Sequence, residues 1–277
     1  MFPRIRGHAF KILKSYCSVR GKSKARRARM DGLFLTYIMI AIFLGALVRS
    51  YFSFGEALIS MPLLALIGLD INTSISVIGL AGLSVAIFNT VSNFKNIKYK
   101  SLLIMLVGSF AGIPTGIYIL NNFDTNKIQT VIAITLALYG FYSFFSRILF
   151  TRSTKGKLQS SFWGVVAGFI SGILGSVYNT HGAPIVIYGT LSKWDLLEFK
   201  DTIQAHFIVT SIFVVIGQAT GNIWTSHTLP IFLMSVPLLI IATFIGKGLA
   251  RKTPNNKFEI WVFLLIGLLG VLLFVSK

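Results

Sequence analysis

A long series of apolar segments constrains this chain more than any other feature of its sequence. Ten such segments recur between Gly32 and Val275, and short polar or basic gaps separate them. A helix of about 17 to 23 residues can cross a hydrocarbon core of roughly 30 Å. Within lipid, only helices and closed barrels satisfy their own backbone hydrogen bonds. The lengths of these segments therefore predict an all-α polytopic membrane protein.

The composition excludes a water-soluble domain. Of the 277 residues, 54% are hydrophobic and only 12% are charged, and the mean hydropathy is +0.76. A soluble chain of this size still leaves roughly a quarter of its surface in water. So few polar side chains could not cover that surface.

The basic charge is distributed as membrane topology requires, not as nucleic-acid binding would require. Lys and Arg number 26 against eight acidic residues, and ten of them lie in residues 1–30, which contain no acid. Most of the others lie between apolar segments, as the positive-inside rule describes for cytoplasmic loops. We therefore expect a basic cytoplasmic tail over residues 1–30, with the Lys95–Lys100 gap and the basic linker 151–160 on the same side. The single cysteine, Cys17, excludes an intramolecular disulfide.

Two basic segments allow more than one interpretation. Residues 1–30 also fit a lipid-surface arm, a transit peptide, or a true start at Met30. The gap Lys247–Lys257 is as basic as the expected cytoplasmic loops, yet a repeated topology would place it on the opposite side of the membrane.

The two halves of the chain are similar to each other. Aligning Pro62 with Pro184 superimposes the apolar residues around both prolines. We predict two homologous repeats, over residues 31–150 and 161–277, each with about four membrane-crossing helices and one broken or re-entrant half-helix. The segment Gly182–Leu191 is too short to cross a bilayer as a helix. A duplicated layout with such breaks is typical of secondary transporters.

The breaks are the expected binding site. Proline is well tolerated in the first turn of a helix, so Pro62 and Pro184 predict the starts of two half-helices. The second break adds hydroxyl, amide and imidazole groups to such a helix N-terminus, where anions bind well. The first break contains Arg49 and Glu56, and ionisable groups at membrane depth usually face a partner or a cavity.

We expect Arg49 to hold an anion and Glu56 to carry a proton; the alternative is an ion pair that only fixes packing. His181 and His206 are the histidines inside apolar segments, and imidazole changes charge near neutral pH. Either could couple transport to protons, or serve as a hydrogen-bonded packing residue. The predicted substrate-binding residues are Arg49, Ser53, Pro62, Gly175, Ser176, Asn179, Thr180, His181, Gly182 and Pro184, and the predicted proton-coupling residues are Glu56, His181 and His206.

Enzyme chemistry is not expected. The chain has no zinc-type His-Glu-x-x-His, phosphate-binding Gly-x-x-x-x-Gly-Lys or Gly-x-Ser-x-Gly motif. A hydrolase built on Ser176, His181 and His206 would lack an acid to orient its imidazole. We expect no metal and no cofactor. The ladder Gly108, Gly112 and Gly116 indicates close helix packing.

The chain resembles the TauE/SafE sulfite exporter family over about Leu33–Phe274. The likeness rests on Gly168–Gly175 with Gly182–Pro184, on their echo at Phe54–Pro62, and on the glycines of Gly108–Gly112. The resemblance implies a two-repeat secondary transporter, proton-coupled and without a nucleotide-hydrolysing domain, that moves sulfite, sulfonates or related small sulfur anions.

The resemblance carries over to particular positions. The family's glycine-rich stretch corresponds here to Gly172, Gly175, Gly182 and Pro184, and in the first half to Gly55 and Pro62. Family members have several consecutive glycines in these stretches, whereas residues 51–56 and 176–181 here are mostly bulky or polar. The resemblance therefore supports the fold more strongly than the substrate.

The sequence thus predicts an integral protein of the plasma (inner) membrane that carries a small anion at a site between the two breaks. The expected partners are this anion and membrane lipid, with no nucleic acid, and a homo-oligomer is left open. The alternative functions are an anion channel and a membrane scaffold. Clustering of polar residues at both breaks favours a binding site over a scaffold.

Overall fold

The structure is a computed structural model of the chain. It describes residues 32–52, 54–89, 96–149, 160–192 and 194–252, and, near the C-terminus, residues 264, 266–272, 274 and 275. The chain divides into two units, residues 1–40 and 41–277, and the account below concerns the second. The predicted tail 1–30 and most of the linker 151–160 lie outside the described residues.

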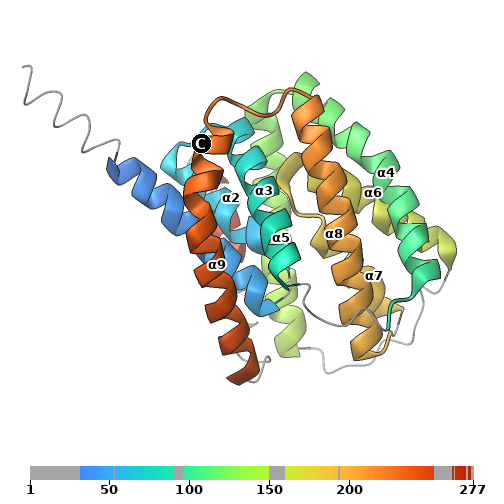
Figure 1. The fold of residues 1–277 in the computed structure, drawn as a ribbon. Coiled ribbons are helices and arrows are strands. Elements are labelled where there is room, and N and C mark those ends of the chain that lie inside the picture. Colours follow the sequence, from blue (N-terminus) through green and yellow to red (C-terminus); the bar gives the residue numbers. More distant parts are fainter. Residues whose placement is uncertain are drawn as a thin grey trace, which may run out of the picture. The chain divides into compact units, whose positions relative to one another are not determined.

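The described residues form helices and no strands, as the sequence predicts (Figure 1). Seven of these helices are long and apolar enough to cross a membrane, and two further helices are short. The C-terminal segment is helical wherever it is described. The long helices are Gly32–Phe52, α3 (Ile71–Asn89), α4 (Tyr99–Asn122), α5 (Thr125–Leu149), α6 (Ser161–Tyr178), α8 (Leu196–Thr220) and α9 (Thr228–Lys252), and the short ones are α2 (Glu56–Ile67) and α7 (Gly182–Leu191).

Each short helix packs back along the long helix that precedes it. The Ser60 hydroxyl of α2 donates to the Ala41 carbonyl at 3.0 Å, while the start of α2 lies beside Arg49, so α2 runs antiparallel to residues 41–52. In the second half, the Ser171 hydroxyl of α6 donates to the His181 carbonyl at 2.7 Å. Both breaks are therefore the tips of helical hairpins.

Left-handed backbone conformations shape the two tips. Gly55, the N-cap of α2, has a φ of 98°, and Asn179, the C-cap of α6, has a φ of 56°. Glycine adopts this region freely, and asparagine is among the side chains that tolerate it best. The chain can therefore reverse direction here within a few residues.

The prediction that Pro62 begins a half-helix is wrong. The helix α2 begins six residues earlier, at Glu56, and Pro62 lies in its interior. The helix N-terminus is set by the reversal at Gly55, and the proline removes only one internal hydrogen bond. Pro184 does lie in the first turn of α7, as predicted.

Helices α4 and α6 approach each other through glycine. A Cβ atom on Gly116 would lie 2.8 Å from the Ile173 carbonyl oxygen, and Cβ atoms on Gly108, Gly112, Gly168 and Gly172 would also collide with the facing backbone. Small residues are the usual means of close helix contact in membranes, because packing replaces the hydrophobic effect there. The predicted packing role of the glycine ladder is confirmed.

The described basic gaps gather at one end of the helical unit. At that end, the Lys98 ammonium pairs with the Glu198 carboxylate at 2.9 Å, and the Lys247 ammonium donates to the carbonyl of Phe88, in the last turn of α3, at 2.6 Å. Of the two placements that the sequence left open for Lys247, the structure therefore has the one at the same end as Lys98. The physical reason is that α6 and α7 form a hairpin, so α7 finishes at the same end of the unit at which α6 begins. Helix α8 starts at this end and runs to the opposite one, and α9 returns to the first end.

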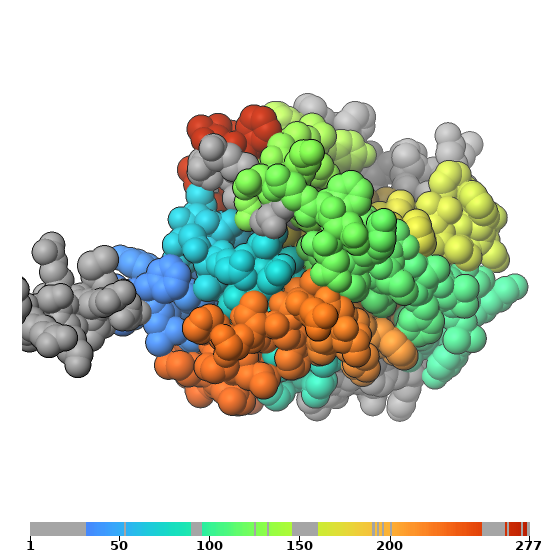
Figure 2. All heavy atoms as spheres, turned by 90° about the horizontal axis from the view of Figure 1, so that it is seen from above, coloured from blue at the N-terminus to red at the C-terminus, as the bar shows by residue number. Residues whose placement is uncertain are grey.

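Figure 2 shows the opposite end of the unit, where the starts of α3 and α9 and the α4–α5 connection lie side by side. The hydroxyls of Thr73 and Thr225 lie 2.8 Å apart, and the Asn121 amide donates to the Gly221 carbonyl at 3.0 Å. Side-chain hydrogen bonds thus join the helix connections of the two halves at this end.

We expect Gly112→Leu to destabilise the protein by about 1 to 3 kcal/mol or more, because the new side chain must separate α4 from α6. The measurement is thermal unfolding in detergent micelles. Gly248→Leu is the matched control, since a Cβ at Gly248 meets nothing within 4 Å. Equal unfolding temperatures for the two variants would contradict the packing role.

Candidate functional site

The two breaks meet inside the unit formed by residues 41–277. One small cavity is lined by Arg49, Gly55 and Glu56 from the first break and by Thr180 and His181 from the second. A second cavity, next to it, adds side chains of α3 and α8. The predicted meeting of the two breaks is therefore observed. More than a hundred residues of sequence separate the two segments, and the packing of the helices brings them together.

A buried ion pair lies at this meeting point. The Arg49 Nη1 atom is 3.4 Å from the Glu56 Oε2 atom, and the two residues are 4% and 2% exposed. They do not share one continuous helix: Arg49 is in the last turn of Gly32–Phe52, and Glu56 is the first residue of α2. A cation at a helix C-terminus and an anion at a helix N-terminus are both favoured by the helix dipoles.

Several polar atoms around the pair have no hydrogen-bond partner among the described residues. These are Arg49 Nη2, Glu56 Oε1 and His181 Nδ1, and all three are buried. A buried polar atom without a partner costs about 1 to 3 kcal/mol. Such atoms cluster where a ligand, a water molecule or a transferable proton belongs.

His181 and Arg49 are held around one aromatic ring. The His181 Nε2 atom lies 3.3 Å from the Ser211 hydroxyl. The His181 imidazole packs edge-to-face against the Phe207 ring, with 5.1 Å between the two ring centres. The Arg49 guanidinium carbon lies 5.9 Å from the centre of the same Phe207 ring, which is within cation–π range. Phe207 and Ser211 both come from α8. Sequence reasoning missed them because nothing distinguishes them from the apolar residues around them.

The Asn179 side chain ties the second break to α3 and α8. Its Nδ2 donates to the Ile75 carbonyl at 2.7 Å, and its Oδ1 accepts from Gln218 Nε2 at 3.2 Å. The predicted substrate-binding residue Asn179 thus lines the cavity while its amide is already engaged. Gln218 also donates to the Ser176 carbonyl at 3.3 Å, so it joins α8 to the end of α6.

Other predicted residues lie away from the small cavities. Ser176 faces α4, where its hydroxyl donates to the Ile113 carbonyl at 3.2 Å, and Gly175 lies under the His181 side chain. Pro62 lines neither cavity, and Pro184 lines an outer groove. Ser53 lies outside the described residues.

His206 belongs to a separate polar cluster. Its Nε2 atom lies 3.0 Å from the Ser109 hydroxyl, which itself donates to the Gly168 carbonyl. The imidazole therefore links α8 to α4 and α6. This geometry is that of the packing alternative, and its use in proton coupling stays a prediction.

The two cavities are small. Their volumes are about 10 and 20 Å³, which is room for about one water molecule each. Glycines of α3 form one wall, and a Cβ on Gly82 would lie 3.0 Å from Glu56 Oε2. An oxyanion would need more space, so binding requires the walls to move. The described residues contain no cluster of three metal-ligating side chains.

Broken helices that meet at a buried charged site, inside a bundle of membrane-crossing helices, are typical of membrane transporters. The family model described as "Sulfite exporter TauE/SafE" matches residues 38–273. The chain therefore belongs to the TauE/SafE family of membrane transporters, as the resemblance implied.

One curated relative is similar over part of its length. The "Probable inner membrane transporter protein TsaS" of Comamonas testosteroni is 20% identical over 163 residues, which are 58% of this chain and 66% of that protein. The match thus spans slightly less than two thirds of the relative. No solved structure matches the chain.

We expect Glu56→Leu and Arg49→Met each to destabilise the protein by about 3 to 5 kcal/mol, because each leaves one buried charge without its partner. The double variant removes both charges and should be more stable than either single variant. Thermal unfolding of all four proteins in the same detergent measures this. Additive losses in the double variant would show that the two side chains act independently.

Proposed function

We propose that this protein is a secondary transporter that moves a small sulfur-containing anion, such as sulfite or a sulfonate, together with a proton across the inner membrane. Membership of a sulfite exporter family supports the substrate class. The similar Comamonas protein bears the name of an inner membrane transporter, which supports the location.

One observation supports the coupling: a buried arginine and a buried carboxylate form an ion pair while each keeps a polar atom without a partner. With Glu56 ionised, the pair is neutral and attracts an anion weakly. When Glu56 takes a proton, the Arg49 charge is left uncompensated in a medium of low dielectric. An incoming oxyanion then restores neutrality and accepts hydrogen bonds from the guanidinium. Anion and proton would therefore bind together.

His181 is the second candidate proton carrier. Its Nδ1 atom has no partner among the described residues, and its ring shares the Phe207 contact with Arg49. A protonated imidazole would add a second donor and a second positive charge for the anion. Thr180 and Gly182, which line the same cavity, would complete the binding surface.

Alternating access would come from motion of the two hairpins. In this conformation the cavities hold about one water each, so the site is closed. We place the hinges of this motion at Gly55 and Asn179, where the chain reverses direction between a long helix and a short one. The order of a long helix, a short helix and further long helices occurs in both halves, and we propose that these halves are the two repeats that rock against each other.

We predict that proteoliposomes containing the protein accumulate sulfite, thiosulfate, sulfoacetate or taurine in response to an imposed pH gradient. Arg49→Met should reduce the flux at least tenfold, because the buried anion then lacks the guanidinium that would balance its charge. Glu56→Gln mimics the protonated carboxyl, so anion exchange should continue while the pH gradient no longer drives accumulation. The measurement is uptake of the labelled anion with and without the gradient.

Two variants control for charge and imidazole chemistry outside the site. Glu198→Gln alters a carboxyl that pairs with Lys98 at the end of the unit, and His227→Ala alters an exposed imidazole. Both should transport like the wild type. Ohmic conductance without a response to the pH gradient would instead establish an anion channel, and flux that survives Arg49→Met and His181→Ala would overturn the residue assignment.

A further inference from the structure

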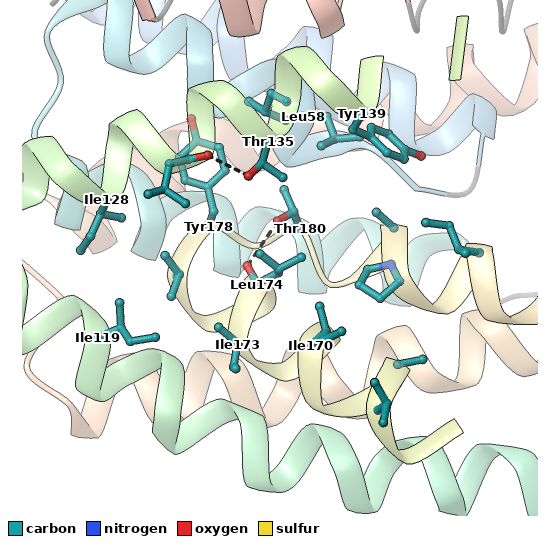
Figure 3. A pocket seen from close by; sticks show the side chains of 18 of the residues that line it. Leu58, Ile119, Ile128, Thr135, Tyr139, Ile170, Ile173, Leu174, Tyr178 and Thr180 are labelled. Carbon is teal, nitrogen blue, oxygen red and sulfur yellow. Dashed lines mark hydrogen bonds between the residues drawn. The ribbon is translucent and has the colours of Figure 1, made fainter. Parts of the chain in front are cut away.

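A second, larger opening lies on the outside of the helical unit. It is a groove of about 580 Å³ between α5 on one side and α6 with α7 on the other (Figure 3). This volume is in the range of small-molecule sites, which is about 300 to 1,000 Å³. Its walls are almost entirely apolar, with Ile128 and Val131 from α5 facing Ile170 and Ile173 from α6.

The groove opens toward the lipid. Val131 is 63% exposed, Ile187 is 47% exposed and Ile170 is 44% exposed, although all three line it. These residues belong to helices within the membrane-spanning unit, so hydrocarbon and not water surrounds them. Water would gain few hydrogen bonds in such a space. The physical environment therefore supplies an acyl chain as the natural occupant.

Two of the polar groups in the mostly apolar lining suggest which lipid binds there. Lys127 lies in the first turn of α5 and carries an exposed ammonium at the groove. The Tyr178 side chain extends from the end of α6 toward α5 (Figure 3). It is 2% exposed, and its hydroxyl has no hydrogen-bond partner among the described residues. By contrast, the hydroxyls of Thr135 and Thr180 in the same lining donate to backbone carbonyls.

We propose that this groove binds one acyl chain of an anionic phospholipid, with the phosphate at Lys127 and an ester carbonyl accepting a hydrogen bond from the Tyr178 hydroxyl. The lining residues of α6 run from Trp163 to Val177, which is about 21 Å along a helix axis. One leaflet contributes about half of a hydrocarbon core of roughly 30 Å. The groove is therefore long enough for a complete chain.

The bound chain would lie against the outer wall of the buried site. Leu58, Thr180 and Ala183 line both the groove and the small cavity that contains Arg49. A chain in the groove thus fills the space into which α7 and the second break could otherwise relax. The lipid becomes part of the packing around the second break.

The test uses the fluorescence of Trp163, which lines the groove. A variant keeps Trp163 and replaces Trp194, Trp224 and Trp261 with Phe. It is reconstituted into phosphatidylcholine bilayers that contain a small fraction of phosphatidylglycerol with brominated acyl chains, which quench tryptophan on contact. We expect stronger quenching than with the same fraction of brominated phosphatidylcholine, because the groove selects the anionic lipid.

Single substitutions test which residues give the groove its preference for phosphatidylglycerol over phosphatidylcholine. Lys127→Ala should lower the preference for phosphatidylglycerol about fivefold, whereas Lys100→Ala, which changes an exposed lysine outside the groove, should leave it unchanged. Tyr178→Phe removes only the hydroxyl and should weaken quenching by both lipids. Equal quenching by the two brominated lipids in the starting variant, or an unchanged preference in Lys127→Ala, would overturn the proposal.

Discussion

Every backbone amide and carbonyl of this protein that lies in hydrocarbon must find its hydrogen-bond partner within the chain. This constraint decides where a helix can be interrupted. The C-terminus of α6 is closed by bonds from the Asn179 amide to the Gly175 carbonyl at 2.8 Å and from the Thr180 amide to the Leu174 carbonyl at 3.2 Å. The Ser171 hydroxyl then satisfies the His181 carbonyl. The break is tolerated because protein groups surround it, and for the same reason it can hold charge.

The buried charges follow from the same logic. An isolated arginine or carboxylate at this depth would be expensive, and the pairing of Arg49 with Glu56 across the break offsets the cost of burying each. The opposed helix ends add favourable dipoles. The arrangement leaves spare donors and acceptors around a cavity, and this is where we propose that an anion and a proton bind together. The contact between α4 and α6 supports this site from outside, since it holds the helix that leads into the second break.

Parts of the site were predictable from the sequence because their chemistry is unusual for lipid. Arg49, Glu56 and His181 stand out in apolar segments, and the structure places all three on the same small cavities. Phe207 and Ser211 also contact these residues, but phenylalanine and serine are common in apolar helices, so the sequence does not single them out. The sequence position of Ser176 does not say which side of α6 it faces, and the structure turns its hydroxyl toward α4. His206 also stands out in an apolar segment, but the structure places its imidazole against Ser109 of α4.

The sequence by itself determined the membrane class, the all-helical fold and the family, because segment length, hydropathy and glycine pattern are local properties. It also located the breaks, although it placed the start of the first short helix at Pro62 instead of Glu56. Only the tertiary structure decided that the breaks pack as hairpin tips against each other, and that Lys247 lies at the same end as Lys98. These depend on the direction in which α2 and α7 turn back, which is set by two left-handed residues and by contacts between segments far apart in the chain.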